Sequence, residues 1–195
     1  MPPTFTFIRH GEALHNLAWH LEGPSAFRDE KNRDARLTVK GVEQAMDVAK
    51  TLSSLKVVGI WSSPLTRCLQ TAEEIFEEVD CNVRDLYVHD NLLERQGNGH
   101  LMNERRSNSE LKKEFGIWDM TSLPDLPPFW ANHESDYALR QRMFMLIMLL
   151  TDIYNECDET SHILIVGHSD AIATLTGKQL KNAEYVSLTL KDIMA

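Results

Sequence analysis

The chain has few of the residues that build metal sites or disulfide frameworks. Its 195 residues include three cysteines, Cys68, Cys81 and Cys157, at spacings that fit no metal motif. It has no pair of CxxC motifs and no HExxH motif. We therefore expect free thiols in a reducing compartment, no bound metal and no cofactor.

Long apolar segments and basic segments are also missing. The uninterrupted apolar run at 143–150 has eight residues, whereas a membrane span needs about 20, so we expect a helix over 135–156 that is buried deeply against a sheet. A net charge of −9 argues against a nucleic-acid partner, because binding a phosphate backbone needs a basic face. Met1-Pro2-Pro3 leads straight into the first expected strand and leaves no room for a leader peptide, so we expect a cytoplasmic protein without a membrane partner.

Apolar runs that are typical of strands alternate with segments that have helical patterns. The expected strands are 4–8, 57–61, 83–88, 161–166 and 184–190, the last at a sheet edge, and the expected helices are 12–22, 38–53, 64–78, 135–156 and 170–178. This alternation predicts an α/β fold, a three-layer α/β/α sandwich with a mostly parallel central sheet. The length fits one domain over 1–195.

A short polar motif, Arg9-His10-Gly11, follows the first expected strand. Ligands of open α/β sheets bind at the carboxyl ends of strands. Arginine can grip phosphate oxygens in a fork, histidine can be a nucleophile, and glycine lets a backbone come close. The motif therefore suits a phosphoryl group, although His10 could instead be a hydrogen-bonded histidine of the core.

Two later segments also follow an expected strand and carry residues that suit an anion. Gly167-His168-Ser169 follows the expected strand 161–166, so both imidazoles meet at one edge if the two strands are neighbours. In the segment 62–72, Ser63 is predicted to cap a helix whose first residue is Pro64, with Arg67 one turn in. A helix N-terminus attracts anions, and Arg67 would add a positive charge, although a solvated arginine on an ordinary helix fits equally.

Five motifs in order now point to one family: RHGE at 9–12, LTVKGVEQA at 37–45, SSPLTRCLQTA at 62–72, LLER at 92–95 and VGHSD at 166–170. With them, the chain resembles the histidine phosphatase superfamily, whose members share the phosphoglycerate mutase-like fold. The segment GNGHLMNERRSNSELKKEF at 97–115 resembles plant and fungal phosphoglycerate mutase-like proteins.

The resemblance implies a role for each matching residue. His10 matches the nucleophile that becomes phosphohistidine, and Glu94 matches the acid that protonates the leaving oxygen and then activates water. Arg9, Arg67 and His168 match the residues that hold the phosphoryl oxygens with positive charge. A histidine nucleophile needs a neutral ring nitrogen, so we expect a backbone carbonyl to hold the other N–H. The acid must start protonated, so we expect a raised pKa for Glu94.

The resemblance also implies contacts with the substrate. Asn16 matches a position that contacts the phosphate or the substrate, although it could equally be a helix-surface asparagine. We interpret 97–134 as a lid or specificity insertion, in which Arg105 would be a substrate-side cation or else part of a solvated patch. Glu134, His100 and His133 are further candidates for the pocket wall. The remaining histidines receive no role: His15, His20, His89 and His162.

The expected reaction is hydrolysis of a small phosphorylated metabolite. After the acid, this chain has Arg95-Gln-Gly-Asn-Gly-His100 where cofactor-dependent mutases carry RHYGALQG-like residues, and it is shorter than those mutases. Two alternatives remain open: a mutase that moves phosphate between hydroxyls, and a protein phosphatase or phosphoprotein-binding module. The sequence does not predict the oligomeric state.

Overall fold

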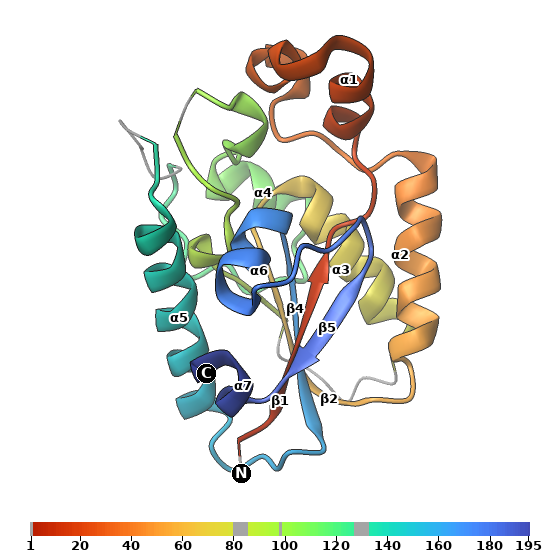
Figure 1. The fold of residues 1–195 in the computed structure, drawn as a ribbon. Coiled ribbons are helices and arrows are strands. Elements are labelled where there is room, and N and C mark those ends of the chain that lie inside the picture. Colours follow the sequence, from red (N-terminus) through yellow and green to blue (C-terminus); the bar gives the residue numbers. More distant parts are fainter. Residues whose placement is uncertain (1, 80–85, 98, 127–132) are drawn as a thin grey trace.

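A five-stranded sheet forms the centre of the computed structural model, which describes residues 2–79, 86–97, 99–126 and 133–195 (Figure 1). In spatial order the strands are β3 (Leu86–Val88), β2 (Lys56–Ser62), β4 (Ser161–Gly167), β1 (Thr4–Arg9) and β5 (Tyr185–Leu188). All neighbours are parallel except β1 and β5, which are antiparallel. The mostly parallel sheet and the edge position of β5 are confirmed. The beginning of the third expected strand, at 83–85, lies outside the described residues, as does Cys81.

Helices cover both faces of the sheet (Figure 1). They are α1 (Leu14–Glu22), α2 (Val39–Leu52), α3 (Thr66–Glu78), α4 (Asn108–Glu114), α5 (Asp136–Ile153), α6 (Ser169–Thr176) and α7 (Leu190–Met194). The side chains of β4 alternate between the faces: Ile163 and Ile165 pack with α5 and α6, whereas Leu164 and Val166 pack with α2 and α3. The three-layer α/β/α sandwich is therefore confirmed.

The apolar run of α5 is only partly buried, contrary to the expectation of a deeply buried helix. Met143, Leu146 and Leu150 are buried against the sheet, whereas Met145 and Met148 on the outer face are exposed. The helix therefore packs through one face, as a surface helix does. None of the helices in the described part of the chain is both long enough and apolar enough to cross a membrane.

The segment 97–134 divides into two parts with different roles. Ser107 caps α4 through a capping box with Glu110. Beyond it, Phe115, Trp118 and Met120 are buried in the core beside α3. Interpreting the whole segment as a lid was therefore wrong for this portion, because these side chains form part of the core. Residues 127–132 lie outside the described part.

The order of the strands brings the two histidine motifs together. Arg9 of β1 is paired with Gly167 of β4, and the His10 N–H donates to the Gly167 carbonyl at 3.0 Å. Both motifs therefore leave the sheet side by side at its carboxyl edge, as the sequence predicted. The helix α1 lies beyond this edge (Figure 1).

Gly11 of the first motif is required by packing against α2. A Cβ on Gly11 would lie 2.3 Å from the Gly41 carbonyl oxygen, and a Cβ on Gly41 would lie 1.9 Å from the Glu12 carbonyl oxygen. Both contacts are with backbone, which cannot rotate away. The close approach predicted for Gly11 is therefore to another part of the chain, and it fixes the loop that carries His10.

We expect Gly41→Ala to destabilise the protein by about 1–3 kcal/mol, because the new methyl group forces the backbone of α2 and the loop at 11–12 apart. In a helix, alanine is more favourable than glycine by about 1 kcal/mol. Any net loss of stability therefore shows that the clash costs more than this gain. Urea unfolding of Gly41→Ala and of the control Glu43→Ala, at an exposed position of α2, checks this. A Gly41→Ala protein as stable as wild type would contradict the packing argument.

Candidate active site

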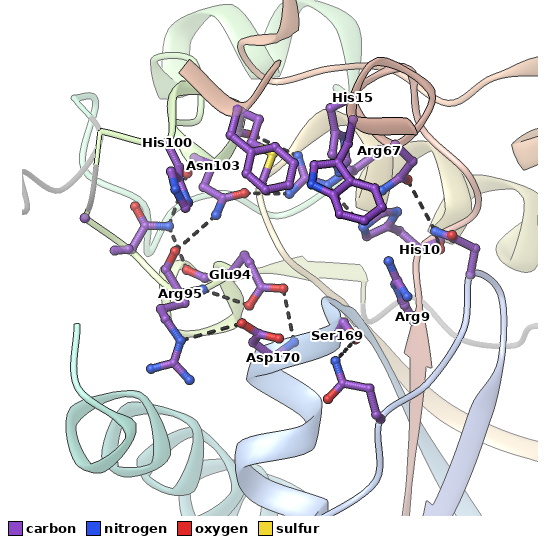
Figure 2. Close-up of a pocket in the computed structure, with 18 of the residues that line it drawn as sticks. Arg9, His10, His15, Arg67, Glu94, Arg95, His100, Asn103, Ser169 and Asp170 are labelled. Atoms are coloured by element: carbon purple, nitrogen blue, oxygen red, sulfur yellow. Dashed lines mark hydrogen bonds and ion pairs between the residues drawn. The ribbon is translucent and has the colours of Figure 1, made fainter. Parts of the chain in front are cut away.

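A cavity of about 780 Å³ opens at the carboxyl edge of the sheet (Figure 2). Its volume is within the range of about 300–1,000 Å³ that is usual for ligand pockets. Five of the predicted site residues line it, namely Arg9, His10, Asn16, Arg67 and Glu94. His168 lies behind them, fully buried, with its ring centroid 5.3 Å from that of His10.

His10 presents one ring nitrogen to the cavity as a neutral acceptor. Its Nδ1 lies 2.7 Å from the Gly11 carbonyl oxygen, which can only accept, so Nδ1 carries the proton. Arg67 donates from Nε to the other nitrogen, Nε2, at 3.3 Å. Burial, and then the charge of Arg67, hold the pKa of His10 well below its ordinary value. The expected carbonyl partner is confirmed, and Nε2 keeps its lone pair.

Arg67 is a buried cation that pairs with neutral acceptors. Its Nη1 donates to the Met102 carbonyl at 2.8 Å, and its Nη2 donates to Asn103 Oδ1 at 3.1 Å. The same Nη2 lies 3.3 Å from Nδ1 of His168. Burial lowers the pKa of Arg67, but a guanidinium keeps its proton in proteins. The site therefore holds a desolvated positive charge between its two histidines.

The N-terminus of α3 is closed by a carboxylate that the sequence analysis missed. The helix begins at Thr66 with Leu65 as its N-cap, so the roles predicted for Ser63 and Pro64 were wrong. Asp34 accepts from the Thr66 N–H at 2.7 Å and from its hydroxyl at 2.5 Å. This carboxylate takes the place that we expected an anionic ligand to occupy, and only the side chain of Arg67 faces the cavity.

His168 is neutral in the unliganded site. Its Nε2 lies 2.8 Å from Ser63 Oγ, while Nδ1 accepts from Arg67. Burial, the charge of Arg67 and His10 hold the pKa of His168 well below its ordinary value. The expectation that His168 supplies positive charge therefore does not hold for the unliganded site. Ser63, predicted as a helix cap, instead orients this ring.

Glu94 sits against the N-terminus of α6 (Figure 2). Its carboxylate accepts from the backbone N–H groups of Arg95, Asp170 and Ala171 at 2.8, 3.2 and 3.1 Å. Burial, and then the negative charge of Asp170, nevertheless raise its pKa above the ordinary value. The direction agrees with what an acid that starts protonated requires.

Arg9 reaches the cavity from the end of β1. Its Nη1 donates to the Leu180 carbonyl at 2.8 Å. Within the described part of the chain, its buried Nε has no hydrogen-bond partner. An unsatisfied buried donor is costly, so Nε is available to an anion in the cavity.

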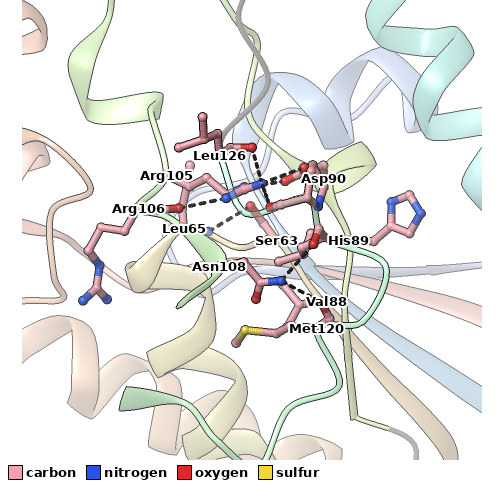
Figure 3. Close-up of polar contacts among 12 residues, drawn as sticks. Ser63, Leu65, Val88, His89, Asp90, Arg105, Arg106, Asn108, Met120 and Leu126 are labelled. Carbon is pink, nitrogen blue, oxygen red and sulfur yellow. Dashed lines mark hydrogen bonds and ion pairs between the residues drawn. The ribbon is translucent and has the colours of Figure 1, made fainter. Parts of the chain in front are cut away.

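Arg105 does not reach the cavity, which corrects the prediction of a substrate-side cation. Its buried guanidinium forms a bidentate pair with Asp90, at 2.8 and 3.1 Å (Figure 3). Its Nη1 and Nη2 also donate hydrogen bonds to the backbone carbonyls of Pro124, Asp125, Leu126 and Arg106. Arg105 therefore anchors the segment after α4 to the end of β3. Glu134 is likewise buried outside the cavity lining, paired with Arg142 at 2.7 Å.

His15 is the residue in the site that sequence reasoning passed over. It is 4% exposed, lines the cavity and places its ring centroid 5.8 Å from that of His10. Asn16 Nδ2 lies 3.1 Å from its Nε2, and Asn16 Oδ1 accepts from the Ala13 N–H. Nε2 is thus the acceptor and Nδ1 carries the proton. Nδ1 is buried with no partner among the described residues. Its position five residues after His10 could have drawn attention to it.

His100 and His133 line the cavity, as the sequence suggested, together with Trp19, Phe27, Arg95 and Asn103. In the part of the chain that the structure describes, no group of three or more histidine, cysteine, aspartate or glutamate side chains is arranged to hold a metal ion.

The buried histidines predict how stability depends on pH. Burial holds the pKa of His15 well below its ordinary value, whereas the unfolded chain protonates this ring below about pH 6.5. Acidification below that pH therefore favours the unfolded state. Between pH 7.5 and 5.5, wild type should lose about 1.4 kcal/mol more stability than His15→Gln, which lacks the titrating ring. Urea unfolding at both pH values measures this difference. His20→Gln, an exposed position on the same helix, should match wild type, and equal losses in wild type and His15→Gln would contradict the prediction.

Comparisons with known proteins identify the family of the chain. The model of the histidine phosphatase superfamily (branch 1) matches residues 5–188. The chain is 36% identical over 92 residues to "Probable phosphatase C1620.13" of Schizosaccharomyces pombe, covering 47% of this chain and 29% of that protein. It is 28% identical over 187 residues to "Probable phosphoglycerate mutase GpmB" of Proteus mirabilis, covering 94% of this chain and 78% of the relative.

A solved structure supports the fold. The ecdysone phosphate phosphatase of Bombix mori, in complex with tungstate, superposes with a TM-score of 0.70 at 15% identity, covering 97% of this chain and 90% of that one. The predicted fold and the predicted family of enzymes are confirmed. The family model covers nearly the whole chain, and the chain therefore belongs to the histidine phosphatase superfamily, branch 1.

Proposed function

We propose that this chain hydrolyses phosphomonoesters of small molecules through a phosphohistidine on Nε2 of His10. The observation that carries the proposal is the state of His10: Nδ1 donates to the Gly11 carbonyl, so the lone pair of Nε2 points at the guanidinium of Arg67. A neutral nucleophile beside a buried cation is the arrangement that an incoming phosphoryl group requires.

Binding of the phosphoryl group replaces contacts that the unliganded site makes within itself. Arg67 transfers its Nε donor from His10 to a phosphoryl oxygen, which frees the lone pair for attack. Arg9 adds its unpartnered Nε. The negative charge that enters the site favours protonation of His168, so that this ring becomes the third cationic group around the equatorial oxygens. Asn16, which lines the same wall, is a further candidate for contact with the substrate.

The chemistry then proceeds in two displacements. In the first, the bond from Nε2 of His10 to phosphorus forms as the bond from phosphorus to the ester oxygen breaks, and Glu94 gives its proton to that oxygen. In the second, Glu94 takes a proton from water, whose oxygen attacks phosphorus as the bond to Nε2 breaks. Phosphate leaves, and His10 and Glu94 return to their starting states.

A mutase is the second candidate, favoured by the relatives named as probable phosphoglycerate mutases. A mutase would return the phosphoryl group to another hydroxyl of the substrate and release little phosphate. A coupled isomerisation assay with a bisphosphate primer separates the two reactions. The phosphoprotein alternative is tested when a phosphopeptide is included among the substrates.

We expect His10→Ala to lose nearly all phosphate release and all covalent labelling, because no other group replaces Nε2. Release is measured with chelator present, from about pH 4.5 to 8, over small phosphomonoesters, a phosphopeptide and an aryl phosphate. Acid-labile labelling of the protein by a radioactive substrate reports the intermediate. His162→Ala, with its histidine at the opposite end of β4, serves as the control. Undiminished release by His10→Ala would overturn the proposal.

We expect Glu94→Gln to slow the hydrolysis of alkyl phosphates by about 10²–10⁴-fold. Formation of the phosphohistidine from an activated aryl phosphate should change far less, because a good leaving group needs little protonation. Single-turnover kinetics with both substrates check this. Equal slowing of both would show that Glu94 is not the acid, and Asp170→Asn, which alters the neighbouring carboxylate, would be tested next.

A further inference from the structure

Aromatic side chains from the helix α1 and the 3₁₀ turn η1 (Gly23–Arg28) line one side of the cavity. Trp19 stacks on Phe27, with ring centroids 6.5 Å apart and planes at 12°. Phe27 in turn lies 5.3 Å from His100. All three residues line the cavity, and we call Trp19, Phe27 and His100 the aromatic wall. Aromatic side chains offer flat, apolar contact area at low entropic cost.

The aromatic wall is continuous with the reacting centre. His15 and Trp19 are four residues apart on α1, so they share one face of the helix about one turn apart. The His15 ring is 5.8 Å from His10, and its buried Nδ1–H has no partner within the described chain. Because His10, His15 and Trp19 all line the same cavity, a leaving group that extends from His10 along α1 passes the His15 ring before it reaches Trp19.

The charges of the cavity argue against a second anionic group on the substrate. Among the described residues that line it, the arginines are Arg9, Arg67 and Arg95, and there is no lysine. Arg9 and Arg67 are placed to hold the phosphoryl group. Arg95 is engaged by Asp136 at 2.7 Å and by Asp170 at 3.6 Å. The negative charge of Asp170, which also lines the cavity, would repel a carboxylate or a further phosphate.

We propose that the preferred substrates are phosphomonoesters whose leaving group is uncharged and carries a flat ring that packs against Trp19 and Phe27. The inference rests on the proposed function, because it assigns the leaving group of the same reaction. It also distinguishes this chain from a mutase acting on a phosphorylated acid, whose substrate carries a carboxylate.

The test compares alkyl phosphates, because their leaving groups differ little in acidity. The substrates are 2-phenylethyl phosphate, ethyl phosphate and phosphoglycolate, which differ in the ring and in the charge. We expect kcat/KM to be at least about tenfold higher for 2-phenylethyl phosphate than for either of the others, a ratio that one stacked ring can supply. Trp19→Ala and Phe27→Ala should each remove most of this preference, measured as the ratio of kcat/KM for 2-phenylethyl phosphate to that for ethyl phosphate, while Trp19→Phe should retain it.

Leu17→Ala is the matched control. Leu17 is about as exposed as Trp19 on the same helix, at 41% against 44%, but it does not line the cavity. The Leu17→Ala protein should keep the preference for the ring. Equal kcat/KM for the two uncharged substrates, a preference for phosphoglycolate, or a preference that survives in both Trp19→Ala and Phe27→Ala would overturn the inference.

A binding measurement separates failure of this inference from failure of the proposed function. Calorimetry compares benzylphosphonate with methylphosphonate, neither of which can be hydrolysed at its P–C bond. Tighter binding of benzylphosphonate by about tenfold, lost in Trp19→Ala, supports the aromatic wall even if no substrate is turned over, in which case only the proposed function fails. Equal binding of the two phosphonates overturns the inference even if phosphate is released.

Discussion

The site depends on a buried guanidinium to which no carboxylate is bound among the residues that the structure describes. Arg67 meets two histidine nitrogens, a carbonyl and an amide oxygen, all of which are neutral acceptors. Burying a cation in this way is costly, because neutral acceptors do not replace bulk water fully. In the proposed reaction, a phosphoryl dianion would restore the missing charge. The donors are already held in place before the substrate arrives, so little reorganisation accompanies the reaction.

The same cation sets the protonation state of its neighbours. Its charge adds to burial in lowering the pKa values of His10, His15 and His168. For a nucleophile this is useful, since only the neutral ring has a lone pair. For His168 the lowered pKa means that, in the proposed mechanism, the ring would gain its positive charge only when the phosphoryl group binds. The site is therefore less positive before the substrate enters than a count of its basic side chains implies.

The fold and the meeting of the two histidine motifs at one sheet edge could be predicted because they depend on local patterns. Strand runs that end in Arg9-His10 and in Gly167-His168 determine which edge carries the chemistry, and parallel neighbours bring these ends together. The misplaced residues depend on contacts between distant segments. Asp34 caps α3 from 32 residues away, and Arg105 is buried by Asp90 and by carbonyls at 124–126. No local pattern shows that an arginine in a polar segment will be buried or that an aspartate will cap a remote helix.

Carboxylates at both helix N-termini explain why side chains hold the phosphoryl group in this proposal. Asp34 accepts from the Thr66 N–H at the N-terminus of α3, and Glu94 accepts from the N–H groups of Asp170 and Ala171 at that of α6, so these N–H groups are not offered to an anion. The two carboxylates have different roles. Asp34 also pairs with Arg106 at 3.0 Å and lies outside the cavity lining, so it serves the scaffold. Glu94 faces the cavity beside Asp170, whose charge opposes a second negative charge. The helix N-terminus therefore positions the proposed acid, while the neighbouring carboxylate raises its pKa and so favours the protonated form that the proposed reaction needs.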